Sequence, residues 1–75
     1  MLNKITIEDF HRFNGKNVRI TYKYFFGGKS HREGRLEVEE YWAYLYDEGK
    51  SGSDYNGAFE LKHGLNEIIS IELME

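Results

Sequence analysis

Apolar and polar residues alternate in several short runs of this sequence, and this two-residue period constrains the fold more than any other feature. Val18, Ile20 and Tyr22 alternate with charged and polar neighbours, and Leu36 and Val38 do the same further along. A half-buried β-strand has this period, because successive side chains point to opposite faces of a sheet. The sequence therefore predicts a mainly β protein.

A short helix is expected before the strands, at about residues 6–13. Thr6 is suited to cap its N-terminus, Ile7 and Phe10 would form one apolar face, and Gly15 would end it. Five strands follow, at about residues 17–25, 34–39, 41–47, 58–62 and 67–73. This order defines one expected domain that covers the whole chain.

The connections between the strands contain turn residues. The stretches 26–34 and 49–57 are rich in glycine and polar residues, and both have the composition of hairpin loops. Glu40 has the same parity as Leu36, so a bend or bulge is expected at Glu39 and Glu40. A long strand bent at that point would serve two layers of a barrel.

With 75 residues, the chain can form one small core. It has no cysteine, so no disulfide can stabilise that core. A flat sheet of this size would leave two exposed edges, so we expect a strongly bent, SH3-like barrel. No apolar run is long enough for a signal peptide or a membrane span, which favours the cytoplasm. The net charge of −3 combines +4 over residues 1–31 with −7 over residues 32–75, so a basic face is compatible with an acidic chain.

Two segments resemble the motifs of the Sm-like family, and within it the bacterial Hfq branch. Residues 34–37 (Gly-Arg-Leu-Glu) and 40–45 (Glu-Tyr-Trp-Ala-Tyr-Leu) are similar to the first motif, in which a glycine opens a strand and an acidic residue precedes an aromatic one. Residues 62–64 (Lys-His-Gly), followed by an isoleucine-bearing strand, are similar to the second motif. Leu61 stands at the position of a family tyrosine, and glycine replaces the family alanine. The resemblance implies an Sm-like barrel.

This resemblance also implies a function. Sm-like proteins form rings that bind single-stranded RNA, so Lys62 is expected to contact phosphate or a base, and His63 to stack or hydrogen-bond. The strands at 58–62 and 67–73 would pair edge to edge between subunits of a homo-oligomer. The alternative for Lys62 and His63 is an ordinary polar turn.

Aromatic residues near these motifs are further candidates. Tyr41, beside the expected bend, is a base-stacking candidate, whereas Trp42 shares the parity of Leu36 and is expected to be buried. Secondary candidates lie in the first loop, where basic and aromatic side chains are interleaved; they are Lys29, His31, Arg32 and Phe26. The alternative for this loop is a solvated hairpin whose phenylalanines fold back onto the barrel.

Enzymatic and metal chemistry find little support in the sequence. The three histidines are far apart, and no serine or carboxylate pair has a catalytic context, so we expect no enzyme activity, metal or cofactor. The competing functional hypothesis is an SH3-like protein-interaction module without nucleic-acid binding, in which the acidic half faces a basic partner.

Overall fold

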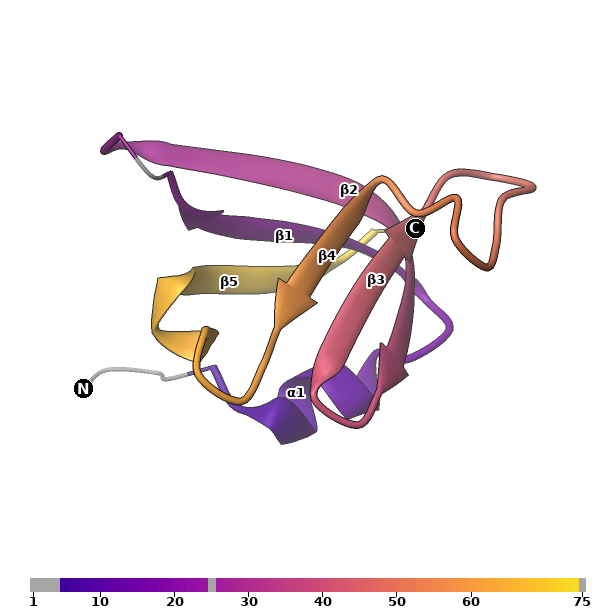
Figure 1. Ribbon diagram of the computed structural model, residues 1–75, viewed down its shortest axis with the longest axis horizontal. Coiled ribbons are helices and arrows are strands. Elements are labelled where there is room, and N and C mark those ends of the chain that lie inside the picture. The colour runs from indigo at the N-terminus through magenta and orange to yellow at the C-terminus, as the bar shows by residue number, and fades with distance from the viewer. Residues whose placement is uncertain (1–4, 25, 75) are drawn as a thin grey trace.

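The computed structural model describes residues 5–24 and 26–74 as a five-stranded antiparallel sheet with one short helix (Figure 1). The elements are α1 (Ile7–Arg12), β1 (Asn17–Lys23), β2 (Lys29–Glu39), β3 (Trp42–Tyr46), β4 (Gly57–Glu60), the 3₁₀ turn η1 (Leu65–Glu67) and β5 (Ile68–Leu73). The strand order is β4-β3-β2-β1-β5, so β4 and β5 form the edges. The expected mainly β fold with one helix and five strands is confirmed. Within the described residues, no strand pairing joins β4 to β5.

The helix forms where the sequence predicts it. The N–H of Asp9 donates to the Thr6 hydroxyl at 3.3 Å, and the N–H of Thr6 donates to the Asp9 carboxylate at 2.9 Å. This reciprocal capping box satisfies backbone groups that have no partner inside a helix. Phe10 projects from α1 into the core and is fully buried. Beyond the helix, the N–H of Val38 donates to the Asn14 side-chain oxygen at 2.9 Å, which attaches the α1–β1 turn to the end of β2.

The first hairpin differs from the prediction. Residues 26–34 are expected to be a loop, but β2 begins at Lys29 and continues for 11 residues. The turn is short because Gly27 and Gly28 adopt φ angles of 99° and 78°, which side chains disfavour. Gly34, expected at the start of a strand, lies in the middle of one. A Cβ at this position would lie 2.8 Å from the backbone oxygen of Tyr46, so the close approach of β2 and β3 requires glycine.

The expected bend at Glu39 and Glu40 is also wrong, because the chain reverses there. Glu39 pairs with Trp42 across a two-residue turn, and Glu40 adopts a φ of 51°. After this reversal, the core-facing positions change from even to odd numbers, since Leu36 lies opposite Leu45. Trp42 therefore lies on the outer face with 44% of its surface exposed, and its predicted burial is wrong.

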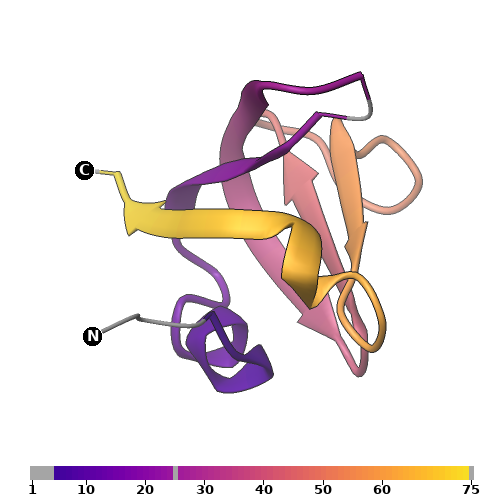
Figure 2. The ribbon, with the colours of Figure 1, turned by 90° about the vertical axis from the view of Figure 1, so that its left-hand side faces the viewer.

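The sheet curves strongly around its core (Figure 2). Tyr22 of β1 and Phe59 of β4 meet edge to face, with ring centroids 5.3 Å apart, although β2 and β3 separate their strands in the sheet. The enclosed core consists of residues from α1, from four of the strands and from the segment after β4: Phe10, Val18, Ile20, Leu36, Ala43, Leu45, Leu61 and Ile68. No helix in the described part of the chain is long and apolar enough to span a membrane.

Candidate nucleic-acid interface

The three predicted RNA-binding residues, Tyr41, Lys62 and His63, lie at the end of the sheet where the β2–β3 turn meets the segment after β4. Tyr41 is the second residue of that turn, and Lys62 and His63 follow β4 closely. The N–H of Leu61 donates to the carbonyl oxygen of Tyr41 at 2.6 Å and holds the two segments together. The Lys62 Nζ lies 5.5 Å from the centre of the Tyr41 ring. Folding thus joins candidates from two separate motifs.

Glu60 organises the turn that carries Lys62 and His63. Its carboxylate accepts the N–H groups of both residues at 2.9 Å. The Nδ1 atom of His63 also lies 3.7 Å from this carboxylate, yet 81% of the His63 side chain is exposed. Gly64 follows, and a Cβ at this position would collide with the Glu60 carbonyl oxygen. The family alanine would therefore not fit this turn without a backbone shift.

This arrangement offers groups that suit a single-stranded nucleic acid. Tyr41 is 47% exposed as a residue, and its ring can serve as a surface on which a base stacks. The Lys62 ammonium beside it can pair with phosphate, and the exposed imidazole of His63 can stack or donate a hydrogen bond. The Glu60 carboxylate lowers the local positive potential, so binding here would depend on stacking as well as on charge.

The secondary candidates lie elsewhere. Lys29, His31 and Arg32 belong to β2, and Phe26 lies in the β1–β2 turn with 84% of its surface exposed. The ring of Tyr24 approaches that of Phe26, with centroids 6.1 Å apart. In Figures 1 and 2 this turn lies at the top of the view, whereas the segment after β4 lies at the bottom. The two predicted groups therefore form separate surfaces.

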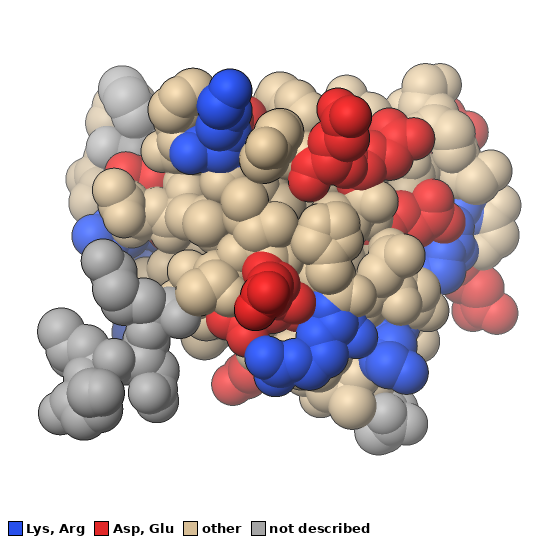
Figure 3. Space-filling model, turned by 90° about the horizontal axis from the view of Figure 1, so that it is seen from below, with Lys and Arg blue, Asp and Glu red and all other residues tan. Residues whose placement is uncertain are grey.

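Charged side chains of both signs are dispersed over the face shown in Figure 3. Lysine and arginine form several small patches there, and aspartate and glutamate form others between them. The separation of charge along the sequence thus does not produce one continuous basic surface on this side. A partner of this face would meet local pairs of opposite charge rather than a uniform field.

The sequence analysis missed a group of rings on the outer side of β3, in which Trp42 and Tyr55 are exposed and Tyr44 is half-buried. We call these three residues the outer aromatic row. The rings of Trp42 and Tyr44 are nearly parallel, with an interplanar angle of 16° and centroids 6.2 Å apart. Tyr55, from the β3–β4 loop, approaches Tyr44 to 5.0 Å. A two-residue turn at Glu40 and Tyr41 would have identified the row, because it places the even-numbered residues of β3 on the outer face.

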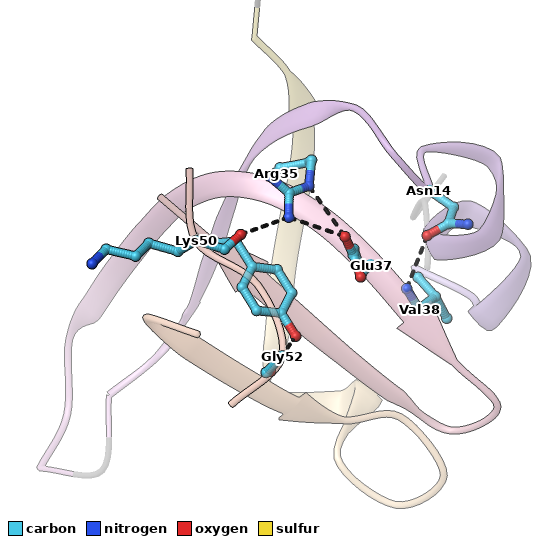
Figure 4. Close-up of polar contacts among 7 residues, drawn as sticks. Asn14, Arg35, Glu37, Val38, Lys50 and Gly52 are labelled. Carbon is cyan, nitrogen blue, oxygen red and sulfur yellow. Dashed lines mark hydrogen bonds and ion pairs between the residues drawn. The ribbon is translucent and has the colours of Figure 1, made fainter. Parts of the chain in front are cut away.

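Tyr46 continues the outer face of β3 but is covered. The Arg35 guanidinium lies 5.2 Å from the centre of its ring and forms an ion pair with Glu37 at 3.0 Å (Figure 4). Arg35 also donates to the Lys50 carbonyl oxygen at 2.8 Å, and the Tyr46 hydroxyl donates to that of Gly52 at 2.8 Å. Burial raises the pKa of the Tyr46 phenol, and the Glu37 carboxylate raises this pKa further. These contacts hold the β3–β4 loop against the sheet.

A groove of about 620 Å³ lies beside this loop, bordered by the start of β1 and the middle of β2. Arg35 lines it together with Glu33, Asp47 and Glu48. Because the groove is lined by side chains of both charges and by no buried cluster of ionisable groups, its chemistry does not favour one class of ligand.

Comparisons with known proteins do not place the chain in a family. No protein-family model, no curated protein and no solved structure matches it. Among residues 5–24 and 26–74, no group of three or more histidine, aspartate and glutamate side chains is arranged to hold a metal ion. The site must therefore be interpreted from its own geometry.

Proposed function

We propose that this protein is an Sm-like β-barrel subunit that binds single-stranded RNA without catalysing a reaction. The observation that carries the proposal is the convergence of Tyr41, Lys62 and His63 from two separate segments. An exposed ring beside an exposed ammonium is a suitable surface for an unpaired base and its phosphate. The strand order, the strong curvature of the sheet and the N-terminal helix agree with the proposed barrel.

Homo-oligomeric assembly is the second part of this proposal. Within the described ranges, 5–24 and 26–74, nothing pairs with the outer edge of β4 or of β5, so β4 of one subunit can pair with β5 of the next. Ile69 and Leu73 of β5 are 37% and 46% exposed, and burying them in an interface would be favourable. Native mass spectrometry tests this part directly: a closed oligomer supports it, and a monomer at micromolar concentration contradicts it.

The RNA-binding part is tested by titrating labelled oligo-uridine at low and moderate salt. We expect Lys62→Ala to weaken binding and to reduce the slope of log K against log salt by about 0.7, because one phosphate contact is lost. Tyr41→Ala should weaken binding by about five-fold or more, whereas Tyr41→Phe retains the stacking face. Lys50→Ala is the matched control, since it removes one positive charge from an exposed position in the β3–β4 loop.

Two results would contradict RNA binding at this site. The first is the absence of saturable binding at low salt. The second is an equal loss of affinity in Lys62→Ala and Lys50→Ala, which would mean that only the total charge matters. Either result leaves the measured oligomeric state to be interpreted on its own.

The second candidate function is a protein-interaction module. The outer aromatic row favours it, because Trp42 and Tyr55 are 44% and 45% exposed and such rings are frequent anchors of protein interfaces. The acidic half of the chain would then face a basic partner. This function uses other side chains than the RNA proposal, but the two sites adjoin, because Trp42 follows Tyr41 and lies opposite Glu60.

A further inference from the structure

The outer face of β3 repeats one pairing of an aromatic ring with a charged cross-strand neighbour. The pairs between β2 and β3 are Arg35 with Tyr46, Glu37 with Tyr44, and Glu39 with Trp42. On the other side of β3, Glu60 of β4 lies opposite Trp42. Side chains that are directly opposite on one face of a sheet are within interaction distance. The rings of Trp42 and Tyr44 therefore have carboxylates as neighbours.

At the Tyr46 end of this face, the chain supplies its own cation. The Arg35 guanidinium lies 5.2 Å from the centre of the Tyr46 ring and 3.0 Å from the Glu37 carboxylate. One planar cation thus satisfies a ring and a carboxylate at the same time. This is the geometry in which arginine differs from lysine, because the guanidinium can stack and donate in the same plane.

At the Trp42 end, the same groups are present without the cation. Within the part of the chain that the structure describes, no lysine or arginine lies over Trp42 or Tyr44, and the Glu39 carboxylate makes no hydrogen bond or ion pair. Trp42 is 44% exposed as a residue, so an incoming side chain can reach it. An aromatic ring and a carboxylate thus adjoin at this end too, which is the combination that Arg35 contacts at Tyr46 and Glu37.

We propose that Trp42, Tyr44 and Glu39 form a binding site for an arginine side chain in a basic peptide segment of a partner protein. The guanidinium would stack on the indole ring and donate to the Glu39 carboxylate, as the Arg35 guanidinium does with Tyr46 and Glu37. The carboxylates of Glu37, Glu39 and Glu60, which lie opposite these rings, attract such a segment. This inference rests on the second candidate function above and is independent of RNA binding at Tyr41.

Charge also argues against other occupants of this site. A phosphate group over Trp42 would be repelled by Glu39 and by Glu60 on either side. A second copy of the chain has a net charge of −3, so these carboxylates attract it less than they attract a basic segment. A basic segment meets no such repulsion.

Trp42 is the sole tryptophan of the protein, so its fluorescence reports on this site directly. We would titrate the whole protein with a short peptide of alternating arginine and serine, and with matched peptides that carry lysine or glutamate in place of arginine. The arginine peptide should change the emission saturably at low salt, bind more tightly than the lysine peptide, and leave the glutamate peptide without effect. Glu39→Gln and Tyr44→Ala should each weaken binding by about two- to five-fold. Glu72→Gln is the control, because it removes the same charge from β5, which β2 and β1 separate from β3.

Several outcomes would overturn the arginine site. These are no saturable response to the arginine peptide, and equal losses in Glu39→Gln and Glu72→Gln. Equal affinity for the lysine peptide would leave a protein-binding module but contradict a site specific for arginine. An emission change with protein concentration alone would assign the row to a second copy, and displacement of the peptide by oligo-uridine would assign it to RNA. Because oligo-uridine binding is measured separately at Lys62, failure of one proposal is distinguishable from failure of the other.

Discussion

Replacing Arg35 by alanine should lower the free energy of unfolding far more than the loss of one exposed surface ion pair usually does. The side chain makes three contacts: an ion pair with Glu37, a hydrogen bond to the Lys50 carbonyl and a stack on Tyr46. The ion pair is partly exposed and contributes about 0.5 kcal/mol, the hydrogen bond about 1 kcal/mol, and the stack about 0.5 kcal/mol. The expected loss is therefore about 2 kcal/mol, against a total stability of about 4–11 kcal/mol for a chain of this length.

Urea denaturation followed by circular dichroism measures this loss, and a thermal scan should show a decrease in Tm of roughly 8–16 °C. Arg12→Ala is the comparison, because Arg12 pairs with Asp9 within one helix, lies 5.8 Å from the centre of the Phe13 ring and has 66% of its side chain exposed, which predicts a loss of about 0.5–1 kcal/mol. Arg35→Lys should recover only part of the stability, since an ammonium cannot stack and donate in one plane. Equal losses in Arg35→Ala and Arg12→Ala would refute the interpretation that Arg35 attaches the β3–β4 loop to the sheet.

Three further substitutions test other contacts. Gly34→Ala should cost about 1–3 kcal/mol in urea denaturation, because its Cβ would meet the Tyr46 backbone at 2.8 Å; a neutral result would show that β2 and β3 can separate. The raised pKa of Tyr46 means that the folded state holds this proton to higher pH than the unfolded state does. The contribution of this proton to stability is therefore complete below about pH 10 and is lost as the pH rises further. Between about pH 8 and pH 11, the wild-type protein should lose more stability than Tyr46→Phe. Equal losses in the two proteins would contradict the raised pKa. Thr6→Ala should cost about 1 kcal/mol by removing the cap of α1, with an unchanged unfolding midpoint as the contrary result.

The strand pattern of this fold follows from the sequence where local rules suffice. Val18 and Ile20 alternate within one strand, and both are buried as predicted, because the period of a strand does not depend on its partners. The helix is likewise predictable, since the Thr6 cap and its partner Asp9 are three residues apart.

The predictions from the sequence were wrong where a turn changes which alternate residues face the core. The alternation through residues 36–46 is consistent with one bent strand or with a hairpin, and only the backbone of Glu40 decides between them. That ambiguity placed Trp42 in the core, and it concealed the outer aromatic row from sequence analysis. Similarly, the polar residues from Lys29 to Glu33 have the composition of a loop, but pairing with β1 holds them in a strand.

The members of the candidate site were chosen from two sequence motifs, but their arrangement in space could not be predicted from the sequence. Lys62 and His63 adjoin each other in sequence, whereas their approach to Tyr41 depends on the register of β3 with β4. Nothing local in the sequence indicates that the Glu60 carboxylate caps their turn.

The pairing of β5 with β1 has a consequence for the order of folding. Val18 and Leu73, which lie opposite each other, are about 55 residues apart in sequence, whereas Lys23 and Lys29 of the first hairpin are neighbours across one turn. Loop-closure entropy makes the longer connection cost about 2 kcal/mol more than the shorter one. The hairpins of β1, β2, β3 and β4 can therefore form early, and docking of β5 completes the sheet last. Until that moment the edge of β1 that pairs with β5 remains open, and this interval is when the chain is most exposed to aggregation.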